Sequence, residues 1–334
     1  MIMYKFLILI ISVISLQSCA QNTKSMNKEV NDILGNLYKE VKHRDKAISY
    51  RAIYFIGGCN FELLINDFPI MTYYGEGDGS LSESAPINTA ILKKGEQTWK
   101  IRVYPVHDKK EIDGKVVSIT RPAIQDGARV ELAIEGIKFK ENGDIEKRFG
   151  KLFEFEAPLK KDEETGKNVF ADAGKPYVEY SGTFYADVPY EVEGWQKSVD
   201  LSKEDPKLLQ AELLKEYEKY KKWIQNRELD KIAESNLKSE KEFANVNFFN
   251  ANLNKEYVDN FIDTWGRENS RTQPLENYSL KYYGNGKIIE LINNSYKKST
   301  LWVSFKDKQG IDKYTLYTLY FHRPKAGGPL EVIR

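Results

Sequence analysis

The strongest candidate nucleophile in this sequence is Cys59, because it follows two glycines. Cys59, Phe61, Leu63 and Ile65 occupy every second position, so we expect Cys59 on the apolar face of a strand. A thiol in apolar surroundings has a raised pKa and is unreactive. The spacing therefore favours a structural role for Cys59 over a catalytic one.

Two glutamates could form a pair of catalytic carboxylates. Glu154 and Glu156 lie on one face of an expected strand, roughly 6–7 Å apart by strand rise, a separation that suits acid and base chemistry on sugars. Charges on a solvent face are the commoner explanation, with Lys138 and Lys140 on the preceding strand as cross-strand partners. The motifs GxSxG, HExxH and CxxC are absent from the sequence, and we expect no catalytic residue.

The sequence gives little support to a metal or phosphate site. The three histidines, His43, His107 and His322, lack the spacing of a zinc site. The run His107 to Glu111 is typical of a solvated loop, and His322 could bind an anion or cap a strand edge. Gly75 to Ser80 offers glycines, two carboxylates and a hydroxyl, but neither the acidic spacing of a calcium loop nor a phosphate-loop pattern. We expect a surface loop there, with no metal and no cofactor.

The N-terminus predicts export. Lys5 precedes an apolar run, Phe6 to Leu16, of about eleven residues, where a membrane-spanning helix needs about twenty. A charged start, a short apolar core and small polar residues are typical of a signal peptide. The next residues, Leu16-Gln17-Ser18-Cys19, resemble the lipobox of bacterial lipoproteins, with leucine three positions before the cysteine and a small residue directly before it. This resemblance covers residues 1–19.

The lipobox resemblance implies a membrane anchor. It implies cleavage before Cys19 and acylation of that residue's thiol and amine, and two or more acyl chains anchor a protein stably. The alternative is an ordinary secretory signal with an incidental cysteine. Aspartate after the cysteine tends to keep Gram-negative lipoproteins in the inner membrane, so Ala20 implies the outer membrane. We expect the protein to be lipid-anchored there and to face the periplasm.

Composition narrows the choice of partners. Cleavage would remove Lys5 and leave equal numbers of acidic and basic residues, which gives no support to nucleic acid as a partner. The expected partners are the membrane, through the lipid on Cys19, and a protein. Cys59 would then be the only remaining cysteine of the exported chain, so its stability must come from its core and not from an internal disulfide.

The periodicity predicts a mainly β chain with an α+β part. Period-two runs predict an N-terminal antiparallel β-sandwich of immunoglobulin-like architecture. A phase slip at Gly136 indicates a bulge, and Asn142-Gly143 indicates a hairpin. Asp205-Pro206 begins a helix whose apolar stripe runs to Ile224, and this helix either breaks near Asn226 or runs to about Lys241. We expect that stripe to be buried against the sandwich, with an exposed partner-binding helix as the alternative.

The chain is expected to divide into five parts. These are a signal peptide (1–18), the lipidated cysteine and tether (19–27), the sandwich with an N-terminal helix (28–200), a connecting helix (201–242) and a C-terminal antiparallel sheet with a helix (243–334). As a whole, the mature region resembles two-domain envelope lipoproteins of Gram-negative bacteria whose function is not characterised. That resemblance implies no functional residue.

Two functions fit these observations. The first is a non-catalytic binding protein, either an immunity-type protein that neutralises a toxin or an accessory of envelope assembly. The second is an envelope hydrolase acting on glycan or peptide through scattered acids such as Glu154 and Glu156. The sequence favours the first function, because it predicts a lipid anchor and a sandwich without a catalytic motif.

Overall fold

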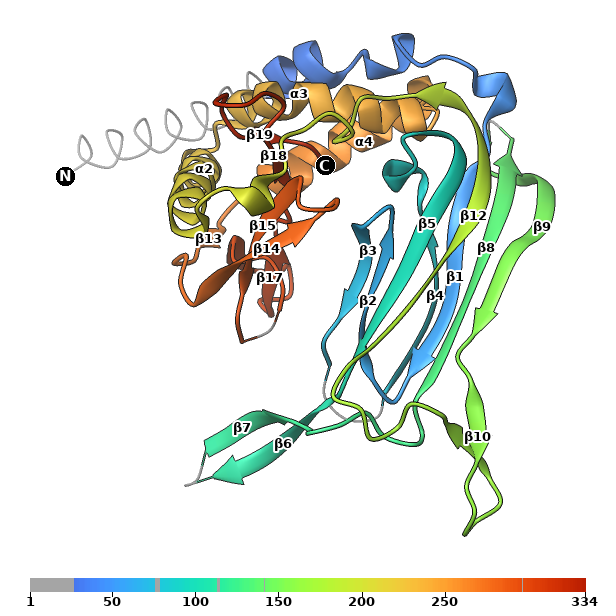
Figure 1. Cartoon of the computed structure of the whole chain (residues 1–334). Coiled ribbons are helices and arrows are strands. Elements are labelled where there is room, and N and C mark those ends of the chain that lie inside the picture. Colours follow the sequence, from blue (N-terminus) through green and yellow to red (C-terminus); the bar gives the residue numbers. More distant parts are fainter. Residues whose placement is uncertain (1–26, 76–78, 113–114, 141, 296) are drawn as a thin grey trace.

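The computed structural model of the chain describes residues 27–75, 79–112, 115–140, 142–295 and 297–334 (Figure 1). Cys19 and the expected signal peptide lie outside these residues. The described part has the expected fold class, with an antiparallel sandwich first, helices in the middle and an antiparallel sheet at the end. No helix within the described ranges is long and apolar enough to cross a membrane.

Two four-stranded antiparallel sheets form the sandwich. The first has the order β4 (Ser80–Pro86), β1 (Ser49–Gly57), β8 (Arg129–Phe139) and β9 (Ile145–Glu156). The second has the order β12 (Val178–Glu191), β5 (Lys93–Tyr104), β2 (Asn60–Ile65) and β3 (Phe68–Tyr73). Their inner faces share one core, in which Trp99 of the second sheet lies 4.9 Å from Phe155 of the first between ring centroids.

The patterns that predict the sandwich strands correspond to its inner faces. Trp99, Ile101 and Val103 are buried on β5, while the alternate Lys100 and Arg102 are partly exposed. The pairing of β8 with β9 shifts register around Glu135 and Ile137, which confirms the bulge expected at Gly136. The predicted hairpin at Asn142-Gly143 joins these two strands.

Two long hairpins extend from one end of the sandwich (Figure 1). One pairs β6 (His107–Ile112) with β7 (Lys115–Thr120), and the other pairs β10 (Leu159–Lys161) with β11 (Asn168–Phe170). The prediction of a solvated loop at His107 is therefore wrong, because this residue begins a strand and its Nδ1 lies 2.9 Å from Thr120 Oγ1. Alternation is weak in these strands because most of their described side chains lie outside the core, Phe170 excepted.

A second core lies among the helices and the C-terminal strands. The helices are α2 (Pro206–Asn226), α3 (Leu229–Val246) and α4 (Ala251–Trp265). One sheet has the order β14 (Tyr278–Tyr283), β15 (Ile288–Asn293), β18 (Phe321–His322) and β19 (Glu331–Val332). The other has the order β13 (Arg271–Thr272), β16 (Trp302–Lys306) and β17 (Asp312–Leu316). Short 3₁₀ helices are η1 (Leu37–Lys39), η2 (Arg44–Lys46), η3 (Asn88–Ala90) and η4 (Leu201–Lys203).

The segment expected to connect the domains forms two packed helices, which confirms the alternative of a break near Asn226. The carboxylate of Asp205 caps α2 by accepting hydrogen bonds from two backbone N–H groups, and α2 ends where Arg227 adopts a left-handed φ of 57°. The stripe on α2 is buried as expected, but against the C-terminal strands and not against the sandwich. Tyr217 shows this, because its hydroxyl donates to the carbonyl of Leu319 at 3.1 Å. Residues 27–34 are helical, and their apolar side chains Val30 and Leu34 also pack in this second core.

The C-terminal half packs on the outer face of the sheet that contains β2 and β3. Antiparallel sheets commonly have one solvated face, but β2 is buried along its whole length, Glu62 included. Glu62 accepts hydrogen bonds from Lys281 Nζ of β14 at 2.7 Å and from Arg102 of β5 at 3.2 Å. The turn after β14 docks next to it, since Gly284 N donates to the carbonyl of Asp67 at 2.9 Å. Paired charges thus join the two halves of the molecule.

Candidate functional site

Cys59 lies just before β2 and is 1% exposed. Burial raises the pKa of its thiol to about 12, so the thiolate needed for attack is not formed at neutral pH. The expected burial of Cys59 is confirmed.

Glu154 and Glu156 lie on the outer face of β9, as the alternation predicts, but their expected lysine partners are wrong. Glu154 pairs with Lys151 of its own strand, and Lys138 pairs with Glu146 at 3.0 Å. The cause is the register, because the bulges in β8 place Ala133 opposite Glu154. Both glutamates line an open depression of about 300 Å³ together with Glu131. Water reaches this outer face freely, unlike the enclosed sites in which carboxylates act as acid and base.

The three histidines do not gather. His43 is exposed before η2, His107 lies on the β6 arm and His322 is 1% exposed in the second core. His322 Nδ1 lies 2.7 Å from Ser198 Oγ, and burial lowers the pKa of the ring to about 4. His322 is therefore neutral at pH 7, which removes the attraction that an anion site needs. Within the described ranges, no three His, Cys, Asp or Glu side chains are close enough to hold a metal ion.

The glycine-rich segment Gly75 to Ser80 falls partly outside the described residues, which exclude 76–78. Of its ends, Gly75 N donates to Asn60 Oδ1 at 2.8 Å, and Ser80 begins β4. The interpretation of this segment as a plain surface loop stays a prediction.

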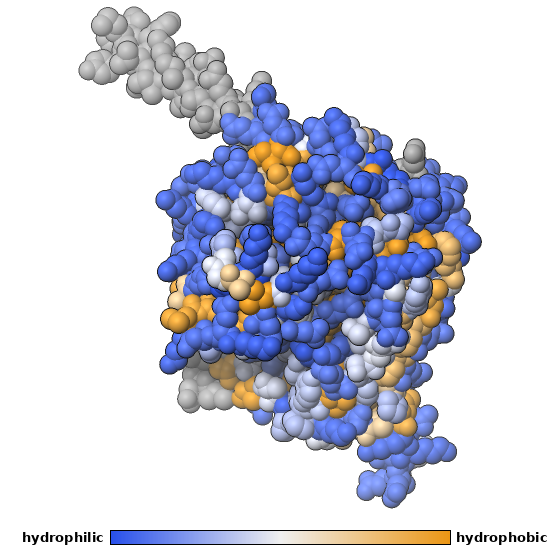
Figure 2. Space-filling model, turned by 45° about the horizontal axis from the view of Figure 1, so that its top comes forward, coloured by the Kyte–Doolittle hydropathy of each residue, from blue (hydrophilic) through white to orange (hydrophobic). Residues whose placement is uncertain are grey.

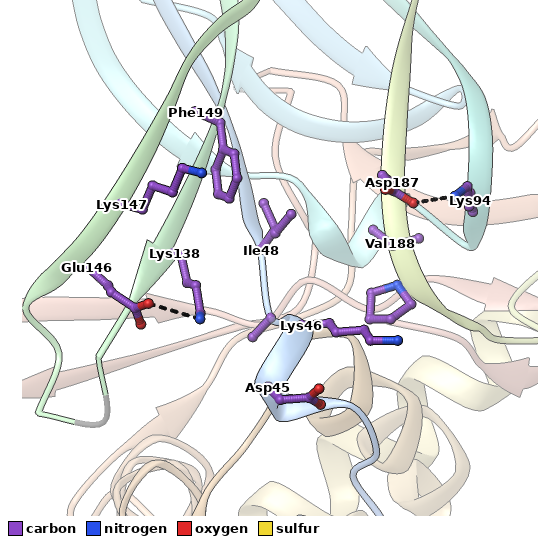
Figure 3. Close-up of a pocket in the computed structure, with 12 residues that line it drawn as sticks. Asp45, Lys46, Ile48, Lys94, Lys138, Glu146, Lys147, Phe149, Asp187 and Val188 are labelled. Carbon is purple, nitrogen blue, oxygen red and sulfur yellow. Dashed lines mark hydrogen bonds and ion pairs between the residues drawn. The ribbon is translucent and has the colours of Figure 1, made fainter.

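A groove lies between the β8–β9 hairpin and β12, at the end of the sandwich nearest the helices (Figure 3). Its volume is about 760 Å³. Four segments that are distant in the sequence line it: the turn before β1, the start of β5, the hairpin and β12. The lining residues are Asp45, Lys46, Ala47, Ile48, Lys94, Lys138, Glu146, Lys147, Phe149, Asp187, Val188 and Pro189.

Apolar side chains lie between the charged walls of this groove. Ile48 lies between Phe149 and Val188 in Figure 3. The missing side chain of Gly136 allows this packing, because a Cβ there would lie 3.2 Å from Ile48 Cγ2 and 3.5 Å from Phe149 Cδ2. Gly136 therefore lies at the bulge in β8 and also leaves room for apolar side chains beside the hairpin.

The charges of the groove are mostly satisfied by one another. Lys94 pairs with Asp187 at 2.6 Å, and Lys138 pairs with Glu146 at 3.0 Å. Lys147 lies over the ring of Phe149, with Nζ 4.7 Å from the centroid. Since the lining holds four lysines and three carboxylates, the groove has only a slight positive excess. Such a wall suits polar contacts along an apolar centre better than the binding of a strongly charged ligand.

The strand beside the groove has a free edge. Within the described sheets, the twelve-residue β9 pairs with β8 alone. Large apolar side chains are exposed along the hairpin, namely Phe139, Ile145, Phe149 and Leu152. Figure 2 shows a largely hydrophilic surface with a narrow hydrophobic band along the right-hand edge, the side on which Figure 1 places β9. Lys147, Lys151 and the positive φ of Gly150 interrupt this edge, which limits indiscriminate pairing.

The sequence reasoning missed this groove. It identified the strands and the bulge, but the lining comes together only through the pairing of β8 with β9 and the approach of β12. One signal was available: Leu152 breaks the alternation of Phe153 and Phe155, so β9 carries apolar residues on both faces. Comparison of the chain with protein-family models, with curated proteins and with solved structures gives no match.

Proposed function

We propose that this chain is a lipid-anchored, non-catalytic binding protein, and that an extended segment of a partner protein adds to β9 and fills the adjoining groove. The observation that carries this proposal is the free edge of β9, with exposed apolar side chains beside a groove of about 760 Å³. A partner strand would gain backbone hydrogen bonds from the edge and specificity from the groove. The lipid on Cys19 would hold this surface near a membrane.

The chemistry of the described side chains also supports binding over catalysis. Cys59 is protonated and buried, and His322 is neutral and buried. The groove itself offers ion-paired lysines and carboxylates, which is an arrangement for contact and not for proton transfer. The partner in this proposal is a toxin that the protein neutralises or a component of envelope assembly.

One substitution tests the binding surface. Leu152→Asp places a charge in the exposed apolar band of β9 without touching the core, because this side chain is already 45% exposed. Leu208→Asp, at a 73% exposed position on α2, is the matched control. Full-length protein isolated from the source cells with its partner should lose that partner in the Leu152 variant and keep it in the control. Equal recovery from both variants would contradict the proposal.

The alternative of an envelope hydrolase predicts a different result. It requires turnover of a glycan or peptide that fails when Glu154 or Glu156 is replaced by glutamine, with Leu152→Asp leaving the rate unchanged. Glutamine substitutions at these exposed positions should leave partner recovery at the wild-type level if the binding proposal is correct.

A further inference from the structure

A second cleft lies at the opposite edge of the sandwich, between β3 and the C-terminal sheets. It consists of two adjoining cavities of about 220 and 280 Å³ that share Lys298 and Leu316. Together they fall within the usual size of small-molecule sites, roughly 300–1,000 Å³. Because β3 and β12 are the two outer strands of one sheet, this cleft is remote from the groove beside β9.

The inner cavity contains a buried acid without a partner. Glu290 of β15 is 4% exposed, lines this cavity, and makes no hydrogen bond or ion pair with the described residues. Lys281 lies directly opposite it in the β14–β15 register, but the Lys281 ammonium is committed to Glu62 at 2.7 Å. Buried polar groups are almost always paired, so an unpaired one that lines a cavity requires an explanation. A ligand that donates a hydrogen bond to Glu290 supplies it.

The rest of the inner cavity is polar. Thr72, Thr318 and Tyr320 line it with hydroxyl groups that have no hydrogen-bond partner among the described residues. Lys298 brings one ammonium, while burial raises the pKa of Glu290 to about 8, so its carboxyl group is largely protonated at neutral pH. The cavity therefore offers hydrogen-bond donors and acceptors on several sides to a ligand.

The outer cavity has an aromatic wall. Tyr74, Trp302 and Tyr314 line it, and the rings of Trp302 and Tyr314 meet edge to face with centroids 6.5 Å apart. Tyr314 is 65% exposed, although large aromatic side chains usually gain stability from burial. Exposed rings beside a polar cavity offer flat apolar faces to a ligand that is polar at its rim.

We propose that this cleft binds a saccharide, with ring hydroxyls on Glu290 and Lys298 and a C–H face against Trp302. Lys298 would repel a simple cation, whereas ring hydroxyls accept hydrogen bonds from Lys298 and both donate to and accept from the carboxyl group of Glu290. Glu290 is the only carboxylic acid among the described lining residues. Glycosidases use a pair of them, so the proposed activity is binding and not hydrolysis. This site goes beyond the proposed partner surface and does not depend on it.

A glycan array tests this site. The full-length protein, kept in a detergent without a sugar headgroup, is applied to an array of neutral, amino and acidic glycans, and the retained glycans are titrated by calorimetry. Glu290→Met removes the hydrogen-bonding carboxyl group at a similar side-chain length, and Trp302→Ala removes the aromatic face. Each should weaken binding of a neutral glycan at least about tenfold, the effect of one lost hydrogen bond or stacking contact.

The control variant is Glu154→Gln, which changes an exposed acid outside the cleft and should bind as wild type does. Equal melting temperatures would show that the three variants are folded. Choline and inorganic phosphate serve as the cationic and anionic probes. The proposal is overturned if no glycan is retained, if the two cleft variants bind as tightly as wild type, or if either ion binds in the glycan's place with dependence on Glu290. None of these outcomes bears on partner recovery through β9.

Discussion

At the scale of single residues, burial decides what Cys59, His322 and Glu290 can do. Burial raises the pKa of Cys59 to about 12, lowers that of His322 to about 4 and raises that of Glu290 to about 8. In each case the low-polarity surroundings disfavour the charged form. At neutral pH Cys59 therefore stays a protonated thiol and His322 stays a neutral ring. Glu290, in contrast, lines a cavity and can still form hydrogen bonds.

The buried His322 makes stability depend on pH. Its folded pKa, about 4, lies below the ordinary value of 6.5, so the unfolded chain binds this proton first as pH falls. Its contribution is fully present above pH 6.5 and is lost as pH falls towards 4, by an amount on the order of 3 kcal/mol. Urea unfolding of wild type and His322→Gln at several pH values between 4 and 7 measures this. The variant should lose less stability than wild type over this window, and parallel curves would contradict the expectation.

Alternation in the sequence predicts the burial of Cys59 but does not reveal that Glu290 lacks a partner. Alternation reports the inner face of a sheet, and Cys59 shares that face with Phe61 and Leu63. Glu290 stands as a lone acid in the apolar run Ile288 to Ile292, which is the only local sign that it is unusual. Its lack of a partner depends on Glu62, far away in the sequence, which takes Lys281 from it.

At the scale of elements, local patterns predict most strands and fail where tertiary packing decides. The hairpin after Asn142-Gly143, the bulge at Gly136 and the cap at Asp205 are all found. The hairpin arms β6–β7 and β10–β11 are missed because few of their described side chains reach the core, so burial imposes no regular alternation on them. The outer face of β2 is covered, because the C-terminal half docks on it through Lys281, and alternation along β2 alone does not reveal this contact.

The ion pairs of Arg323 link the last strands to α2, and their contribution to stability can be measured. Its guanidinium is 7% exposed and binds Glu204 at 3.0 Å and Glu212 at 2.7 Å, the latter on α2. Arg323→Ala should lower the free energy of unfolding by about 2 kcal/mol, since hydrogen bonds to charged groups are lost while both carboxylates regain water. Lys28→Ala, which breaks an exposed pair with Asp32, should change it by less than about 0.5 kcal/mol. Equal losses in urea unfolding would show that Arg323 is not a structural link.

At the scale of the whole molecule, the described chain begins beside α3, and the two hairpin arms extend from the opposite end of the sandwich (Figure 1). A lipid on Cys19 would therefore hold the helical end towards the membrane and the arms away from it. The groove beside β9 would lie on the flank between these ends. This arrangement leaves β9 accessible to a partner while the chain is anchored.

The anchor is tested directly by Cys19→Ala. The variant should move from the membrane to the soluble fraction and lose incorporation of radiolabelled palmitate, while Cys59→Ala should keep the label because that thiol is buried. Lipid label that persists in the Cys19 variant would show that the lipobox resemblance is misleading.

The central claim is that a partner binds along β9, and site-specific photo-crosslinking in the source cells tests it most directly. A photoreactive amino acid replaces Leu152 in the full-length protein, and replaces Leu208 in the control, both at exposed positions. We expect one discrete crosslinked product at position 152, containing a single protein identified by mass spectrometry, and none at position 208. The same products at both positions, or no product at position 152, would contradict the account.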